Sequence, residues 1–332
     1  MSRGAKITLV IFVILFVIAG LLVGAWFVFK NERASAAESY ILQGDNYLNQ
    51  ENFAEALIAY KKASLLTPRS YAPYLKQGLL AKETANYKEA IDFIKHSINF
   101  GKQEAGAYLV LGETYLLDND IQNAEIAFKQ AKQIVPSSDE IDFLLFKLSL
   151  KNNDLDEAQK NLSAAQKNND LPKYKIYEAL LESFSDPSKS MTIISEINQC
   201  ADINSLSLND FSNLFQKLVS TENITSREIM IYETFSQIGE VDFGIMGLES
   251  ITKENPDIRD AWVFLSYSYL LKNEPDKAKI TLDKALNLDP VYPATHYLLS
   301  KYYEAKQNTN EAQKAYERAK ELGFDENNPL KS

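Results

Sequence analysis

A period of 34 residues recurs along most of the chain after residue 36. In its full form the pattern is an aromatic residue followed by a small residue, a second aromatic, Ala, a bulky apolar residue, Ala and Pro, at fixed spacings, and the units at 71, 139 and 225 keep only part of it. The units begin without any insertion at positions 37, 71, 105 and 139, and again at 225, 259 and 293. Two helices of about a dozen residues, joined by a short polar turn, fill such a unit. The chain is therefore expected to fold as a stack of repeats, and not as ordinary globular domains.

The unit at residues 105–138 carries the whole pattern, and the unit at 37 departs from it only at Gln43. Small residues at facing positions let two helices pack closely, and proline ends a second helix. The pattern resembles the tetratricopeptide repeat (TPR) family. The resemblance implies an all-α fold, a right-handed superhelical solenoid of helix-turn-helix repeats, and the apolar run described below adds one transmembrane helix before it. The residues that carry it in the clearest unit are Tyr108, Leu111, Gly112, Tyr115, Ala124, Phe128, Ala131 and Pro136.

The repeats and the gap between them predict the organisation of the chain. Residues 37–172 hold four TPR repeats, and residues 225–326 hold three TPR-like repeats. The period fails in between, where three helical segments are expected to form an irregular joint between two superhelical segments. The remaining parts are an N-terminal stub at 1–6, a transmembrane helix at 7–29, a short linker at 30–36, the joint at 173–224 and a tail at 327–332.

Residues 7–29 contain no charged side chain. As a helix they are roughly 34 Å long, enough to cross a bilayer. Trp26 and Phe27 suit the membrane interface, and Lys30 and Arg33 follow as anchors. Residues 34–36 resemble a signal-peptidase site, but the apolar stretch is longer than that of a signal peptide. We therefore expect an uncleaved anchor whose helix continues through the linker into the first repeat.

The charges that flank this segment predict its orientation. The terminal amine, Arg3 and Lys6 precede it, against Lys30 and Arg33 after it, so the positive-inside rule favours a cytoplasmic N-terminus and extracytoplasmic repeats. The expected location is the plasma membrane of a bacterium.

Within the apolar segment, Gly20 and Gly24 form a Gly-x-x-x-Gly pair, which allows a second helix to approach closely. A homodimer through this helix is the functional interpretation. The alternative is that glycine is simply common in membrane helices.

The sequence contains few of the residues that catalytic or metal sites need. Residues 1–36 carry four basic side chains and one acidic one, so residues 37–332 carry 31 basic and 44 acidic ones, a balance that disfavours nucleic-acid binding. Cys200 is the sole cysteine, and His96 and His296 are the only histidines. Phosphate-loop, dinucleotide and His-Glu-x-x-His motifs do not occur. We expect no enzymatic activity, catalytic residue, metal or cofactor.

The first helices of TPR repeats line a surface that binds partners, and the second, fifth, ninth and twelfth positions commonly face it. Apolar and acidic residues at these positions suit a peptide with apolar anchors and some basic character, although some of them could instead pack between repeats. The cation slots with which some family members hold acidic chaperone tails contain Ile41, Asp45, Gly106 and Val110, which disfavours that class. The candidate groove residues are Ile41, Asp45, Leu75, Leu79, Leu109, Glu113, Val263, Tyr267, Tyr297 and Lys301.

The resemblance implies a membrane-anchored scaffold or adaptor for peptides or partner proteins, in envelope assembly, secretion or protein quality control. The chain is also similar to membrane-anchored bacterial repeat proteins of envelope assembly, but it lacks the C-terminal cysteine module of the lipopolysaccharide-assembly member. The principal alternative is a non-catalytic regulatory subunit of a membrane-associated enzyme complex. A hydrolase and a purely structural homo-oligomer are the remaining classes.

Overall fold

The computed structural model describes residues 3–101, 104–197, 203–204, 206–326 and 330. These residues form seventeen helices and no strand, with one isolated bridge between Ile203 and Leu206. The expected all-α repeat fold is confirmed. The chain divides into two compact units, Met1–Pro136 and Ser137–Ser332, which we call the first and second units.

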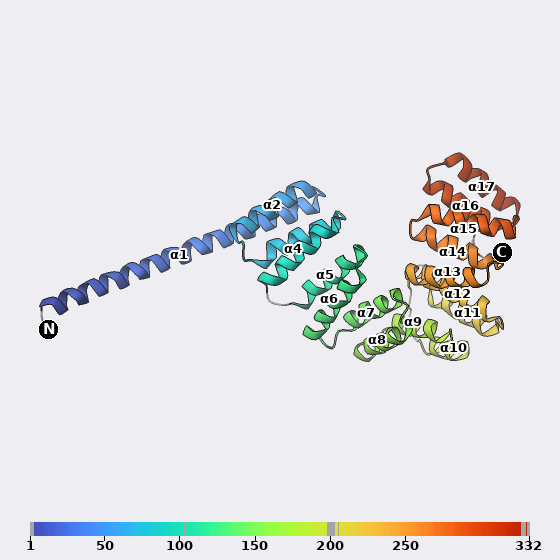
Figure 1. Cartoon of the computed structure of the whole chain (residues 1–332), viewed down its shortest axis with the longest axis horizontal. Helices are drawn as coiled ribbons and strands as arrows, with labels where there is room; N and C mark the ends of the chain where they lie inside the picture. The colour runs from blue at the N-terminus through green and yellow to red at the C-terminus, as the bar shows by residue number, and fades with distance from the viewer. Residues whose placement is uncertain (1–2, 102–103, 198–202, 205, 327–329, 331–332) are drawn as a thin grey trace. The chain divides into compact units, whose positions relative to one another are not determined.

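The first unit consists of three helix pairs, each joined by a tight turn (Figure 1). Glycines on the first helices make close packing possible: a Cβ added at Gly112 would lie 2.4 Å from Cε1 of Phe128, whose side chain is completely buried. Gly44 faces the buried ring of Tyr60 in the same way. The pairs are α1 (Arg3–Asn49) with α2 (Phe53–Leu66), α3 (Tyr71–Glu83) with α4 (Tyr87–Phe100), and α5 (Ala105–Leu117) with α6 (Ile121–Ile134).

The turn inside each helix pair follows the same period as the sequence. One left-handed residue recurs in these turns, and the backbone N–H that follows it donates to the carbonyl five residues earlier, as in Asp120 N to Tyr115 O at 2.8 Å. The hydrogen bond recurs in all seven units. The left-handed residues are Glu51, Ala85, Asn119, Asn153, Gly239, Asn273 and Gln307.

Helix α1 runs from Arg3 to Asn49 without a break, so residues 30–36 are helical and lead directly into the first repeat (Figure 1). Among the described residues it is the one helix long and apolar enough to cross a membrane. Its most apolar part has a mean hydropathy of 2.0 and is not buried against the rest of the chain. Helix α1 is therefore a candidate membrane anchor.

The second unit contains eleven helices among its described residues. The three helices expected between 173 and 224 are present as α9, α10 and α11. The elements are α7 (Asp139–Lys151), α8 (Leu155–Asn168), α9 (Pro172–Glu182), α10 (Pro187–Ser195), α11 (Leu208–Ser220), α12 (Ile224–Gln237), α13 (Val241–Glu254), α14 (Arg259–Leu271), α15 (Pro275–Leu288), α16 (Pro293–Ala305) and α17 (Thr309–Glu321).

The expected joint does not separate two stacks. One buried cluster contains residues of α9, α10 and α11 together with residues of the repeats on both sides. Its members include Phe146 of α7, Tyr174 of α9, Phe211 of α11 and Phe235 of α12. The boundary between compact units lies at Pro136 instead. The physical reason is that helices α9 to α11 carry enough large apolar side chains to bury them against the repeats on both sides.

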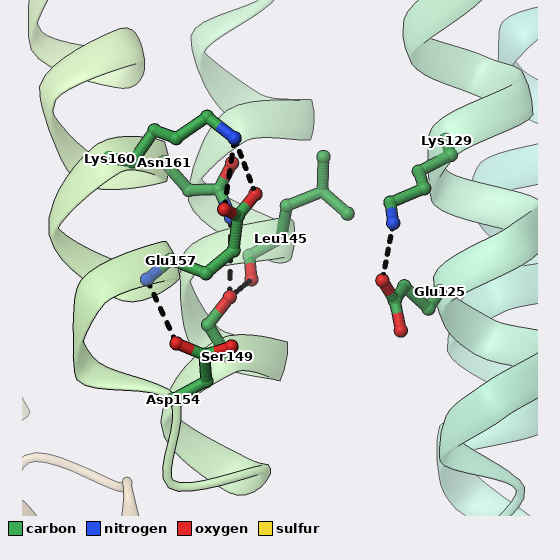
Figure 2. A network of polar contacts seen from close by, with 8 residues as sticks. All are labelled: Glu125, Lys129, Leu145, Ser149, Asp154, Glu157, Lys160 and Asn161. Atoms are coloured by element: carbon green, nitrogen blue, oxygen red, sulfur yellow. Dashed lines mark hydrogen bonds and ion pairs between the residues drawn. The ribbon is translucent and has the colours of Figure 1, made fainter.

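Polar contacts join the two helices of the fourth repeat, where Phe146 occupies the position of the usual glycine. Asn161 Nδ2 donates to Ser149 Oγ at 3.2 Å, and that hydroxyl donates to the carbonyl of Leu145 at 2.9 Å (Figure 2). Asp154 caps α8 by accepting from the backbone N–H of Glu157 at 3.0 Å. One side-chain hydrogen bond, from Asn161 to Ser149, thus connects α7 and α8 in the repeat where the glycine is absent.

Two ion pairs connect α7 to the start of α13. Lys147 Nζ lies 2.8 Å from Glu240 Oε1, and Lys151 Nζ lies 2.9 Å from Asp242 Oδ2. The hydroxyl of Tyr177 also donates to Glu240, at 3.0 Å. The fourth repeat is therefore tied directly to the repeat that begins at 225, across the irregular helices.

Candidate functional site

A groove of about 970 Å³ lies in the second unit. We call it the C-terminal groove. It is formed by α11 and by the first helices of the last three repeats, α12, α14 and α16. Both apolar and polar side chains line it, including Leu214, Met230, Glu233, Phe264, Tyr267 and Tyr297.

Two of the predicted residues, Tyr267 and Tyr297, line the C-terminal groove, and both are half-buried. Burial raises the pKa of Tyr267, and the nearby charge of Glu233 raises it further. The Tyr267 hydroxyl therefore stays protonated near neutral pH and is available as a hydrogen-bond donor inside the groove.

Lys301 lies in a neighbouring pocket of about 580 Å³ between α16 and α17, which Tyr297 also lines. Its Nζ is 2.9 Å from Glu304 Oε2. The Lys301 charge is thus partly neutralised by a carboxylate of its own helix, and the pocket offers a mixed polar and aromatic wall.

The expectation that Val263 faces a groove is wrong, because only 1% of this residue is exposed. Val263 belongs to the buried cluster of the last repeats. Helix α14 contacts the first helices on both sides, α12 and α16, as well as α13 and α15. Val263, the fifth residue of its unit, is therefore enclosed by the helices on both sides of α14.

In the first unit, the predicted acidic residues are already paired. Asp45 lies 2.8 Å from Lys76 Nζ and accepts a hydrogen bond from the Tyr60 hydroxyl at 2.7 Å. Glu113 pairs with Lys82 at 2.5 Å. These contacts link the first helices α1, α3 and α5, so the two acids are engaged within the array and do not by themselves require a basic partner.

The apolar residues predicted in the first unit are only partly accessible. Ile41, Leu75 and Leu109 are half-buried, and Leu79 is 36% exposed. Ile41 packs against the buried cluster of the first repeat. Leu79 is therefore the most accessible of these apolar residues.

Gly20 and Gly24 are exposed, and a Cβ added at either would meet nothing within 4 Å. The face of α1 that they form is open.

The histidines and the cysteine do not form a site within the described residues. His96 stacks on Tyr74 with ring centroids 5.7 Å apart, and His296 Nε2 lies 2.9 Å from the carbonyl of Pro290. Cys200 lies outside the described residues. No group of three or more His, Cys, Asp or Glu that could hold a metal is found in the described part of the chain.

The repeat pattern did not reveal that α11 and a residue of the predicted tail help to line the C-terminal groove. Leu214 and Asp210 of α11 line the C-terminal groove, and so does Leu330, which lies in the predicted tail. Neither segment falls within a 34-residue unit. The amphipathic spacing of Phe211, Phe215 and Leu218 is the signal that could have identified α11 as a packed helix.

Comparison with protein families matches the tetratricopeptide repeat at residues 37–70, 105–137, 260–292 and 293–322. These segments correspond to the first, third, sixth and seventh of the units found by spacing. The chain therefore contains tetratricopeptide repeats, as its sequence pattern indicated.

Two curated relatives align with short parts of the chain. Tetratricopeptide repeat protein 21B of Mus musculus is 31% identical over 77 residues, which is 23% of this chain and 6% of the relative. An uncharacterized protein of Haemophilus influenzae is 44% identical over 62 residues, which is 19% of this chain and 35% of the relative. The chain thus spans only a minor part of the length of these relatives.

Similar solved structures include a tetratricopeptide repeat protein from Parabacteroides merdae, with 11% identity, a TM-score of 0.44 and coverage of 89% of this chain and 96% of that one. YrrB, described as a TPR protein with an unusual peptide-binding site, has 16% identity and a TM-score of 0.31, and the match covers 75% and 98% of the two chains. A chain of the Naa15/Naa10 complex bound to HypK-THB has 11% identity and a TM-score of 0.41, with 86% and 64% covered.

Proposed function

We propose that this protein is a membrane-anchored scaffold that binds peptide segments of partner proteins in the C-terminal groove. The observation that carries the proposal is the groove itself, where half-buried Tyr267, Tyr297 and Met230 face a space of about 970 Å³. Aromatic and methionine side chains that are partly exposed in a groove are typical anchors for a bound peptide.

The dimensions of the groove suit an extended segment. It runs over four helices, α11, α12, α14 and α16, and packed helices lie about 8–10 Å apart. An extended chain rises about 3.3 Å per residue, so about eight or nine residues cross the four helices. The Tyr267 hydroxyl and the carboxylate of Glu233 provide polar groups beside the apolar ones, which suits the alternation of backbone and side chains in a peptide.

Membrane attachment by residues 7–29 is the second part of the proposal. The exposed apolar surface of α1 has no covering in the described part of this chain, and lipid would remove it from water. At its end, Lys30 Nζ lies 5.2 Å from the Trp26 ring centroid and Arg33 lies 5.2 Å from that of Phe29. Aromatic and cationic side chains at one level are typical of a membrane interface.

The proposed arrangement has a cytoplasmic N-terminus and repeats on the other side of the membrane, with self-association through Gly20 and Gly24. Envelope assembly, secretion and protein quality control are the proposed settings. A role as the regulatory subunit of an enzyme complex would follow if the captured partner is an enzyme whose activity changes on binding.

The proposal is tested by crosslinking in native membranes followed by mass spectrometry. Tyr267→Ala removes an anchor from the groove, and a central aromatic anchor contributes about 2 kcal/mol, or roughly thirtyfold in affinity. We expect partners captured by the unmodified chain to be lost from this variant.

The matched control is Tyr71→Ala, which removes a 43% exposed tyrosine of the first unit. It should keep the same partners, with circular dichroism showing both variants folded. An unchanged set of partners in Tyr267→Ala would refute binding in the C-terminal groove.

A further inference from the structure

The end of α2 returns toward the apolar part of α1. Helix α2 packs along α1 in the opposite direction, and the Lys62 ammonium lies over the ring of Tyr40, 5.5 Å from its centroid (Figure 1). Both helices rise about 1.5 Å per residue, so Leu66, the last residue of α2, is level with about residue 36. This level is about 10 Å beyond Phe29, where the apolar segment ends. Because α1 is unbroken here, a continuous helix sets that distance.

Exposed apolar and aromatic side chains gather at this end of the first two repeats. We call residues 61–71 and 96–101, which are the end of α2, the turn to α3 and the end of α4, the proximal edge. The two segments are adjacent, since a Cβ added at Gly101 would lie 3.1 Å from Cβ of Tyr71. Leu65 is 75% exposed, Tyr71 43% and Phe100 40%. The proximal edge is therefore an apolar and aromatic surface close to the apolar segment of α1.

The two ends of these repeats also differ in charge. The proximal edge carries the exposed cations Lys61, Lys62 and Arg69 and no carboxylate. The turns at the opposite end, residues 49–55 and 83–89, carry four acidic side chains and one basic one. The adjoining residues 30–38 of α1 hold two charges of each sign and do not cancel the difference. Positive charge is thus in excess at the end that lies toward the apolar segment.

The position of the proximal edge suits contact with lipid headgroups. The headgroup layer on each side of the hydrocarbon core is about 5–8 Å thick, so an edge about 10 Å beyond the core lies just outside this layer. Membrane helices tilt by about 20° on average, which brings one side of an attached domain closer to the bilayer. Basic side chains are attracted to anionic headgroups, and aromatic side chains favour the membrane interface.

We propose that the proximal edge binds anionic lipid headgroups, so that the first two repeats lie on the bilayer surface beside the anchor helix. The inference rests on the membrane attachment in the proposed function and adds a lipid-binding surface on the repeats themselves. The anchor keeps the edge at a high effective concentration near the bilayer. A weak contact is therefore enough to hold the repeats against the membrane.

The test uses the full chain reconstituted in vesicles of phosphatidylcholine and phosphatidylglycerol. In a Cys200→Ser background, Leu65→Cys carries a nitrobenzoxadiazole fluorophore, and a phosphatidylcholine with a nitroxide on its headgroup quenches fluorophores at the bilayer surface. The matched control is Ile58→Cys, which is 46% exposed and lies two turns earlier on the same face of α2, about 10 Å further from the membrane. We expect quenching at Leu65→Cys to be at least about twofold stronger than at Ile58→Cys.

The charge of the edge is tested in the same labelled chain. Arg69→Glu should roughly halve the quenching at Leu65→Cys, and so should vesicles of phosphatidylcholine alone. Lys88→Glu, which reverses an exposed lysine near the start of α4 at the opposite end, should leave it unchanged. Equal quenching at Leu65→Cys and Ile58→Cys in folded chains would overturn the inference. Quenching that responds neither to Arg69→Glu nor to the removal of phosphatidylglycerol would overturn it as well.

A fluorophore at Leu22→Cys, inside the apolar segment, separates this result from failure of the proposed membrane attachment. A nitroxide on the lipid acyl chain should quench it. Quenching at Leu22→Cys without stronger quenching at Leu65→Cys than at Ile58→Cys would keep the anchor and overturn the lipid-binding edge. Absence of quenching at Leu22→Cys would remove the anchor from the proposed function, and the edge would then stand only if Leu65→Cys is still quenched more strongly than Ile58→Cys.

Discussion

At the scale of single residues, the packing of α5 against α6 depends on the missing side chain of Gly112. A Cβ there would lie 2.4 Å from Cε1 of Phe128, whose ring is fully buried, so the packing around it would have to shift. We expect Gly112→Ala to destabilise the repeats by about 1–3 kcal/mol, the usual cost of overpacking. Urea unfolding of the full chain in detergent, followed by circular dichroism, measures the change.

Gly106→Ala is the matched control, because Gly106 lies on the same helix and an added Cβ there meets nothing within 4 Å. Alanine favours a helix by up to about 1 kcal/mol over glycine, so this variant should be as stable as the unmodified chain or slightly more so. Equal destabilisation by the two substitutions would contradict the packing explanation.

Single residues also show where prediction from the sequence stops. In the unit at 225, Tyr232 stands where the first three units have glycine. Gly247 lies opposite, so that an added Cβ would be 2.2 Å from the Tyr232 ring. The large side chain here lies on the first helix and the glycine on the second, which the repeat pattern does not anticipate. Val263 and Leu330 could not be placed for a related reason, since their burial depends on neighbouring repeats distant in sequence.

At the scale of elements, the link between α7 and α13 depends on Asp242, which lies 2.9 Å from both Lys151 Nζ and Lys272 Nζ. Burial by itself raises the pKa of Asp242, but the hydrogen bonds and charges of Lys272 and Lys151 outweigh it, and the net change is downward. A carboxyl with a lowered pKa in the folded state stabilises that state at pH values above its unfolded pKa of about 4. This stabilisation is lost as the pH falls through the lower, folded pKa.

We therefore expect Asp242→Asn to destabilise the second unit near neutral pH. The side chains are partly exposed, so the loss should be at most about 1 kcal/mol. The difference from the unmodified chain should shrink as the pH falls below about 4. Urea unfolding at neutral pH and at a pH of about 3 measures both values.

Asp283→Asn is the control for the Asp242 experiment, because Asp283 pairs with Lys279 on its own helix and is about half exposed. A smaller loss is expected there. A loss for Asp242→Asn that is the same at both pH values would show that the ion pairs are not its cause.

Helix α1 carries a prediction of its own, because Gly20 and Gly24 leave an open strip on its exposed surface. Small residues at this spacing let two membrane helices approach closely. Replacing both by Ile fills the strip, and we expect self-association in detergent to weaken at least about tenfold, measured by sedimentation. The control is the pair Ala19→Ile and Val23→Ile, which has the same spacing on an adjacent face and should leave self-association nearly unchanged. If the glycine variant forms the same oligomer as the unmodified chain, the proposed dimer is wrong.

Most elements could be predicted because their signals are local. The 34-residue spacing, the turn residues and the apolar run of α1 each depend on neighbours within a few turns of helix. The grouping of elements could not be predicted in the same way. Helices α9 to α11 interrupt the period, and the sequence suggested a joint there, yet Tyr174 and Phe211 bury them in one core with the repeats on both sides.

At the scale of the whole molecule, the proposed orientation rests on three positive charges before residues 7–29 and two after them. A cysteine can report the side on which the second unit lies. In a Cys200→Ser background, Ser163→Cys places a thiol at an exposed position of α8, away from the residues that line the C-terminal groove. We expect a membrane-impermeant maleimide to label this thiol in intact bacterial cells that produce the chain.

Deletion of residues 7–29 from the same variant provides the control, because the chain then lacks the segment that would carry it across. Its thiol should be labelled only after the cells are lysed. If the full-length variant also requires lysis while it remains in the membrane fraction, the repeats lie on the cytoplasmic side. The partners of the C-terminal groove would then have to be sought among cytoplasmic proteins, although the contacts proposed for Tyr267 would be unchanged.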